Sequence, residues 1–127
     1  MDRIECARQL RTDPNVHYNC CQSVLIPFAD KIGMTKEQLT ALGAHFGSGM
    51  RHGSACGAFS GAMMALGLLG YDEQVAASLI RQFKADHGAT DCATLLKTSR
   101  ERGEAKMDHC NGLIFEMVAA LDAILAK

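Results

Sequence analysis

The sequence predicts an all-α protein: a small bundle of about five to six helices forming a single domain over residues 1–127. Apolar residues recur at intervals of three and four, which is the spacing of one helix face. Capping residues precede these segments, and glycines follow several of them. No segment alternates apolar and polar residues as a strand does. A chain of this length suits one domain with one core.

The first expected helix covers residues 14–32. Asp13 is a candidate N-cap before a first-turn proline, and Gly33 ends the segment. Pro27 is expected to kink the helix near its end. The apolar residues of this segment recur at helical spacing: Val16, Cys20, Val24, Phe28 and Ile32. Because adjacent helical side chains point about 100° apart, we expect Cys20 to share this face and Cys21 to lie off it.

Two further helices follow. Thr35 and Gln38 form a capping-box pattern that opens a short helix closing near Phe46. After a glycine-rich loop over residues 47–53, Ser54 is expected to cap a helix over residues 55–69. The stretch from Ala55 to Gly70 is the most apolar, but it is shorter than the ~20 residues that cross a bilayer. It predicts a buried core helix.

The remaining helices have clear signals. Asp72 is expected to cap a fourth helix that Gly88 ends, and Thr90 or Asp91 opens a short fifth one near Leu95. The last helix begins near Gly103. Its apolar stripe is the most regular in the chain: Met107, Cys110, Ile114, Met117, Leu121 and Ile124.

Composition excludes several classes of function. The 13 basic and 14 acidic residues give a net charge of −1, which favours neither nucleic acid nor an anionic membrane as partner. The first ten residues lack a signal-peptide core, so we expect a cytoplasmic protein with reduced thiols. The glycine-rich loop at residues 47–53 lacks the Gly-Lys-Ser/Thr ending of a phosphate loop. Paired carboxylates suited to hydrolysis are not evident.

The six cysteines are the main candidates for reactive or metal-binding residues in this sequence. In such a compartment they are ligands, redox thiols or buried hydrophobic residues rather than disulfides. Cys56 is expected in the first turn of a helix, where unpaired N–H groups stabilise a thiolate, so it is a candidate catalytic thiol of low pKa with Cys20 as partner. Cys6 and Cys21 are expected to have no role at the site.

Glycines and histidines add candidates around Cys56. Gly57 and Gly61 leave one helix face bare, so that another backbone or a bound group can approach closely. His52 precedes Cys56 by one helical turn and is a candidate for cofactor binding. His109 is expected to face away from the site, because its neighbour Cys110 faces the core and adjacent side chains of a helix point in different directions.

Four short motifs occur in order along the chain: Asn19-Cys20-x-Gln22-Ser-Val, Cys56-Gly-Ala-x-x-Gly61, Asp91-Cys92-x-x-Leu95 and Cys110-x-x-Leu-Ile. Together they resemble the C-GCAxxG-C-C family of putative redox-active proteins over roughly residues 15–125. The family string is Gly-Cys-Ala-x-x-Gly, whereas glycine follows the cysteine in this chain. A similar domain occurs in split-Soret cytochromes, but no Cys-x-x-Cys-His is present here to attach haem.

The resemblance implies that Cys20, Cys56, Cys92 and Cys110 converge and bind a metal. An iron–sulfur cluster, [2Fe–2S] or [4Fe–4S], is the first hypothesis, because either type takes four cysteine ligands. Electrons would pass to a redox partner protein or a small oxidised substrate. A homodimer is a further expectation.

Three alternatives stay open at this point. Zinc also binds four thiolates, but its structural sites usually contain closely spaced cysteine pairs. A thiol–disulfide oxidoreductase would instead cycle Cys56 with a second cysteine and need no metal. A helical interaction module would use the cysteines only for packing.

Overall fold

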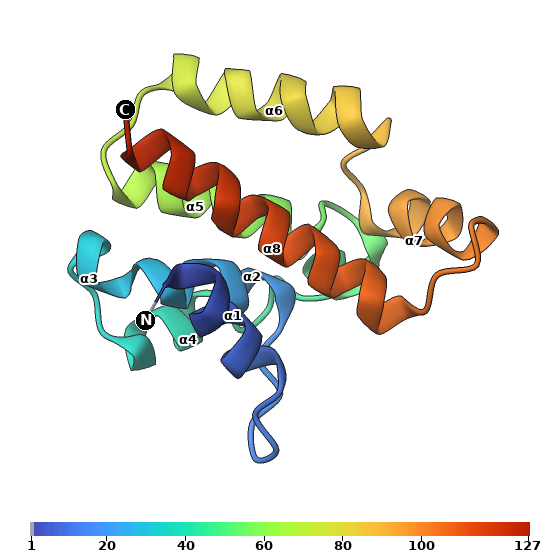
Figure 1. Cartoon of the computed structure of the whole chain (residues 1–127), viewed down its shortest axis with the longest axis horizontal. Helices are drawn as coiled ribbons and strands as arrows, with labels where there is room; N and C mark the ends of the chain where they lie inside the picture. Colours follow the sequence, from blue (N-terminus) through green and yellow to red (C-terminus); the bar gives the residue numbers. More distant parts are fainter. Residues whose placement is uncertain (1) are drawn as a thin grey trace.

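The computed structural model describes residues 2–127, and every regular element in that range is a helix (Figure 1). The α-helices are α1 (Arg3–Arg11), α2 (Cys20–Leu25), α3 (Ala29–Ile32), α4 (Lys36–Leu42), α5 (Gly57–Leu68), α6 (Glu73–His87), α7 (Cys92–Glu101) and α8 (Lys106–Leu125). Two short irregular helices, η1 (Ile26–Phe28) and η2 (Gly49–Gly53), complete the order. The all-α prediction is confirmed, with more helices than expected.

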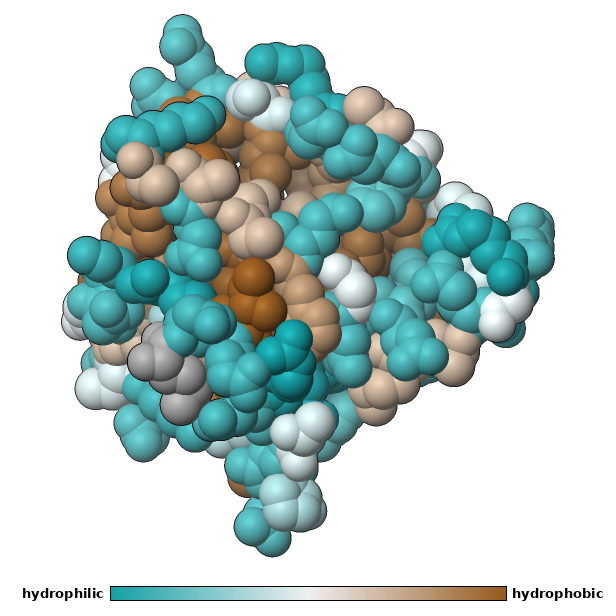
Figure 2. Space-filling model, viewed as in Figure 1, coloured by the Kyte–Doolittle hydropathy of each residue, from teal (hydrophilic) through white to brown (hydrophobic). Residues whose placement is uncertain are grey.

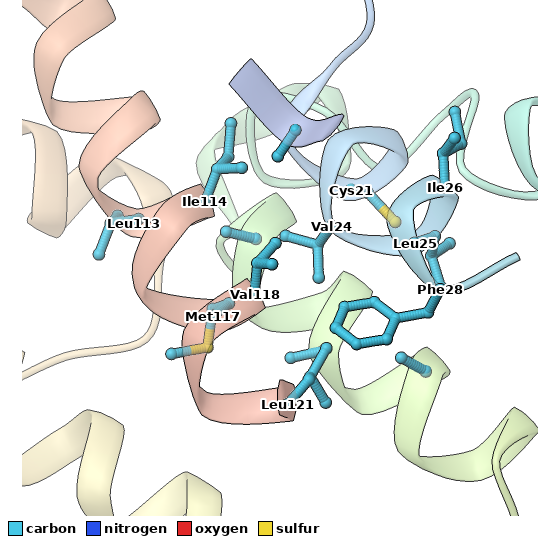
Figure 3. Close-up of a cluster of buried hydrophobic side chains, with 14 of the residues drawn as sticks. Cys21, Val24, Leu25, Ile26, Phe28, Leu113, Ile114, Met117, Val118 and Leu121 are labelled. Atoms are coloured by element: carbon cyan, nitrogen blue, oxygen red, sulfur yellow. The ribbon is translucent and has the colours of Figure 1, made fainter. Parts of the chain in front are cut away.

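The core lies where α2, α5 and α8 pack against one another, with α1 against α8 (Figure 1). Figure 3 shows Val24 and Phe28 on the side that faces the α8 residues Ile114 and Val118, with Leu25 behind Val24. All five side chains are fully buried. Each contributes about 1.5–3 kcal/mol by leaving water, so this cluster fixes the position of α8 beside α2.

The first helix starts later than expected, which corrects the prediction over residues 14–32. Asn19 and Gln22 form a complete capping box, so α2 begins at Cys20. The carboxylate of Asp13 accepts hydrogen bonds from the N–H groups of Asn15 and Val16 and closes a turn instead of a helix. Val16 is 44% exposed as a result and does not join the core.

Some of the other boundaries agree with the sequence, but the expected cap at Ser54 is wrong, because α5 begins at Gly57 with Cys56 as its N-cap, and α4 ends at Leu42 and not near Phe46. Pro27 lies in η1, which separates α2 from α3, so the expected kink is confirmed. The capping box of Thr35 opens α4, and Asp72 and Asp91 cap α6 and α7. On α8 the stripe is buried at Ile114, Met117 and Leu121, but Met107 is 50% exposed. Helix α1, capped by Asp2, was not expected.

The bare glycine face of α5 serves close helix packing. A Cβ atom on Gly61 would lie 3.0 Å from the carbonyl oxygen of Cys21 and 3.1 Å from Cβ of Val24. A Cβ atom on Gly57 would lie 2.7 Å from the carbonyl oxygen of Phe46 and 3.0 Å from Cβ of Cys20. Both glycines therefore let α5 approach the segment that carries Cys20.

Helix α6 lies apart from α1 and α2, across α8 (Figure 1). Apolar residues show between α6 and α8 (Figure 2), where a groove is lined by Val75, Leu79, Ala120 and Ile124 among others. In the part of the chain that is described, the helices fall short of the length and apolar character needed to span a membrane.

Candidate functional site

A cavity of about 310 Å³ lies where α2, α5, α7 and α8 begin, and four cysteines line it: Cys20, Cys56, Cys92 and Cys110. Cys20 and Cys92 are the first residues of α2 and α7, Cys56 is the N-cap of α5, and Cys110 lies in the second turn of α8. All four are free thiols. The structure thus brings together the four cysteines singled out in the sequence.

The backbone ties Cys56 to Cys92. The N–H of Cys56 donates to the carbonyl of Thr90 at 2.8 Å, and the N–H of Cys92 donates to the carbonyl of Ser54 at 2.6 Å. These bonds form an isolated antiparallel bridge between Ala55 and Asp91. Two of the four thiols are therefore carried by one paired backbone unit.

Cys20 and Cys110 form a second pair, because both line the cavity and each thiol shifts the pKa of the other. The hydrogen bond from Cys20 lowers the pKa of Cys110 to about 6, and the positive charges of Arg11 and Lys106 act in the same direction. The same bond, together with burial, raises the pKa of Cys20. Cys110 is therefore the thiolate of the pair near neutral pH.

Cys56 does not have the low pKa expected for it. It occupies the N-cap position and not the first turn, and its side chain is buried. Burial raises the pKa of the Cys56 thiol, although backbone N–H groups of Phe59 and Ala58 act in the opposite direction. Burial likewise raises the pKa of Cys92.

Two cationic side chains, Arg11 and Lys106, line the cavity together with His17 and His109, and the lining contains no aspartate or glutamate among the described residues. Burial lowers the pKa of His109. Arg11 is held in place by hydrogen bonds to the carbonyl of Tyr18 at 2.7 Å and to Oδ1 of Asn111 at 2.8 Å. The cavity is therefore suited to negative charge on its thiols.

The other expected site residues lie in different places. Gly57 lines the cavity, while Gly61 packs against α2 behind it. His52 is exposed and is not part of the lining. His109, expected to face outward, is buried and lines the cavity because α8 turns this side toward α7. Cys21 is fully buried with its sulfur 3.6 Å from that of Met64, away from the cavity.

Sequence reasoning missed Arg11 and His17 as residues of the site. Arg11 lies on α1, which has no strong apolar pattern, and His17 lies in the loop that was expected to be helical. Their proximity to the cysteines depends on how α1 packs against α8. The one local signal was the position of Lys106, one helical turn before Cys110.

The geometry also bears on the kind of metal. Among residues 2–127, no three His, Cys, Asp or Glu side chains are arranged to hold a single metal ion. A tetrahedral zinc site brings four sulfur atoms to within about 2.3 Å of one ion. The four thiols surround a cavity and are not collapsed onto one point.

Comparison with known proteins adds one match. The family model described as "Putative redox-active protein (C_GCAxxG_C_C)" matches residues 18–124. No curated protein and no solved structure matches this chain.

Proposed function

The chain belongs to the C_GCAxxG_C_C family of putative redox-active proteins, and from this premise we propose that its four cavity-lining cysteines hold an iron–sulfur cluster for electron transfer. The observation that carries the proposal is that Cys20, Cys56, Cys92 and Cys110 come from four separate helices and line one cavity. Two thiols suffice for disulfide chemistry, whereas four thiolates are the ligand set of [2Fe–2S] and [4Fe–4S] clusters.

The donor set fits a cluster. Cysteine thiolates alone can satisfy it, and the cavity provides space among them. A cluster distributes its cysteine ligands over two or four iron atoms, so it does not require the single-ion arrangement that is not found among residues 2–127. A bound cluster would supply one-electron transfer.

Nearby cations favour the charged form of Cys110 and offset part of the effect of burial at Cys92. Arg11 and Lys106 lower the pKa of Cys110 and Lys106 lowers that of Cys92, so both cations favour deprotonated ligands. Backbone N–H groups of Ala58 and Phe59 also act to lower the pKa of Cys56. Polar groups close to a ligand sulfur are one means by which a protein sets a cluster's reduction potential.

Apolar side chains restrict water on the inner side of the cavity. Leu95 of α7 and Leu113 of α8 are buried residues of its lining. Removal of water strengthens the interaction between the thiolates and the cations. The inner wall therefore protects the site from water. We expect electrons or substrate to reach the thiols from the side where the lining is polar.

The proximity of Cys20 and Cys110 favours a second candidate function, thiol–disulfide exchange. In this reaction the Cys110 thiolate attacks one sulfur of a small disulfide substrate, and the other sulfur leaves and takes up a proton. Cys20 then loses its proton and displaces the bound sulfur, which leaves a second substrate thiol and a Cys20–Cys110 disulfide. The sequence-based alternative assigned the attacking role to Cys56.

One experiment tests both candidates. Protein purified without oxygen is analysed for iron and acid-labile sulfide and by visible absorption. Iron and sulfide in equal amounts, lost in Cys20→Ser and in Cys110→Ser but kept in the control Cys6→Ser, would support cluster binding. Protein that stays metal-free after reconstitution with iron and sulfide would contradict it. A Cys20–Cys110 disulfide formed by mild oxidation of that protein would then support the exchange reaction.

A further inference from the structure

A second cleft, of about 430 Å³, opens beside the cysteine cavity. The two share three lining residues, His17, Asn19 and Ser48. The remaining wall of the cleft includes Gln22 and Arg51. A molecule lying in this cleft is therefore next to the opening of the cavity that holds the four thiols.

The wall that carries Ser48 and Arg51 is a left-handed turn. Ser48, Met50 and Arg51 have φ values of 52°, 55° and 68°, and Gly49 between them has a φ of 62°. Left-handed geometry costs about 1–2 kcal/mol for each non-glycine residue. Strain of this kind is concentrated at functional sites. Here it places Ser48 and Arg51 on the same cleft.

Folding uses only some of the polar side chains in the cleft. Asn19 donates to the carbonyl of Gly43 and accepts from the N–H of Gln22, while Gln22 accepts from the N–H of Asn19 and donates to the carbonyl of Thr40. These two amides therefore have partners already. Within residues 2–127 the side chains of His17 and Ser48 make no hydrogen bond.

Arg51 has both a fixed orientation and free donors. Its Nε donates to Nδ1 of His45 at 2.9 Å, and its terminal nitrogens have no acceptor or carboxylate partner within the described chain. The cleft lining contains no aspartate or glutamate. A guanidinium with free terminal nitrogens binds a carboxylate or phosphate through two parallel hydrogen bonds.

We propose that this cleft binds the carboxylate or phosphate group of a small molecule whose remaining part faces the cysteine cavity. Arg51 supplies the charge and the paired donors, and Ser48 and His17 supply further hydrogen bonds from the wall shared with the cavity. The identification of this molecule as a redox substrate rests on the proposed function, whereas anion binding by the cleft does not.

The test uses inorganic phosphate as the probe and the full chain, freed of metal and fully reduced. Phosphate is titrated while backbone amide signals are followed by NMR, at an ionic strength held constant with chloride. We expect saturable shifts centred on residues 17–19 and 47–52. Arg51→Asn removes the charge but tolerates left-handed geometry, and it is expected to weaken binding by about tenfold or more. Arg81→Ala, on the exposed face of α6, is the matched control and keeps full affinity.

The controls separate binding from folding and from the proposed function. An unchanged melting temperature of Arg51→Asn would show that lost binding is not caused by unfolding. Absence of saturable shifts in the unsubstituted protein, or equal affinity in Arg51→Asn, would overturn the proposal. The titration requires neither a metal nor a redox change. A protein that fails to assemble a cluster can therefore still bind phosphate, and a protein that assembles a cluster can fail to bind phosphate.

Discussion

The thiols of Cys20 and Cys110 line the same cavity, although one opens α2 and the other lies in α8. Their interaction lowers the pKa of Cys110 and raises that of Cys20. This contact distinguishes the two cysteines from Cys56 and Cys92, whose thiols have a raised pKa because of burial.

The Cys110 thiol is expected to show a shifted pH profile of alkylation. Because its pKa is lowered to about 6, the reactive thiolate predominates above that pH and declines below it. In metal-free protein, the rate of iodoacetamide labelling at Cys110 should level off near neutral pH. Cys6, whose pKa is raised, should still gain reactivity above pH 8. Labelling of individual cysteines by mass spectrometry measures both profiles.

Cys20→Ala removes the hydrogen bond that is the main cause of the low Cys110 pKa. The labelling profile of Cys110 should therefore move to higher pH, while Arg11 and Lys106 preserve part of the shift. Cys6→Ala serves as the control and should leave the profile in place. A Cys110 profile that coincides with that of Cys6 in the unsubstituted protein would refute the assignment.

Gly61→Ala is expected to destabilise the protein by about 1–3 kcal/mol. The added Cβ would lie 3.0 Å from the Cys21 carbonyl, so α5 and α2 must separate. Gly67→Ala on the same helix meets no atom within 4 Å and should stabilise by about 0.5–1 kcal/mol. Urea unfolding measures both; equal effects at the two positions would argue against close packing of α5 on α2.

Asn19→Ala should lower the free energy of unfolding by about 0.5–2 kcal/mol, because it removes the capping box that starts α2. Thr35→Ala removes the equivalent cap of α4 and should cost a similar amount. Only Asn19→Ala is expected to alter the labelling profile of Cys110, since Asn19 positions the adjacent Cys20. If both variants changed that profile equally, the cap of α2 would have no specific role at the site.

The left-handed turn predicts opposite effects at two neighbouring residues. Met50→Gly should stabilise by about 1 kcal/mol, because Met50 is exposed and has a φ of 55°. Gly49→Ala should destabilise, since its φ is 62° and a Cβ would lie 2.7 Å from Cβ of Cys92. Thermal unfolding distinguishes them. A loss of stability in Met50→Gly would show that its side chain makes contacts that outweigh the strain.

The sequence predicted helices well where a cap and an apolar stripe occur together, as at Thr35, Asp72 and Asp91. It failed between Asp13 and Asn19, because both are good caps and only tertiary packing decides which of them starts a helix. Helix α1 was missed because five of its nine residues are polar or charged, and its buried face is limited to Ala7 and Leu10.

The candidate site was predictable in its residue types but not in its electrostatics. The spacing and neighbours of the four cysteines are visible in the sequence. The low pKa of Cys110, the position of Arg11 and the inward direction of His109 depend on how distant helices pack. Local reasoning placed the thiolate at Cys56 because helix termini favour it, whereas burial dominates there.

The order in which the four cysteines of the cavity are translated determines when the site can form during synthesis. Cys20 is translated well before its partner Cys110, which lies on α8, the last of the helices described here. At elongation rates of about 5–20 residues per second, the nascent chain carries separate thiols for several seconds. Any chemistry that needs all four thiols must therefore wait until α8 has been translated and has packed against α2 and α5.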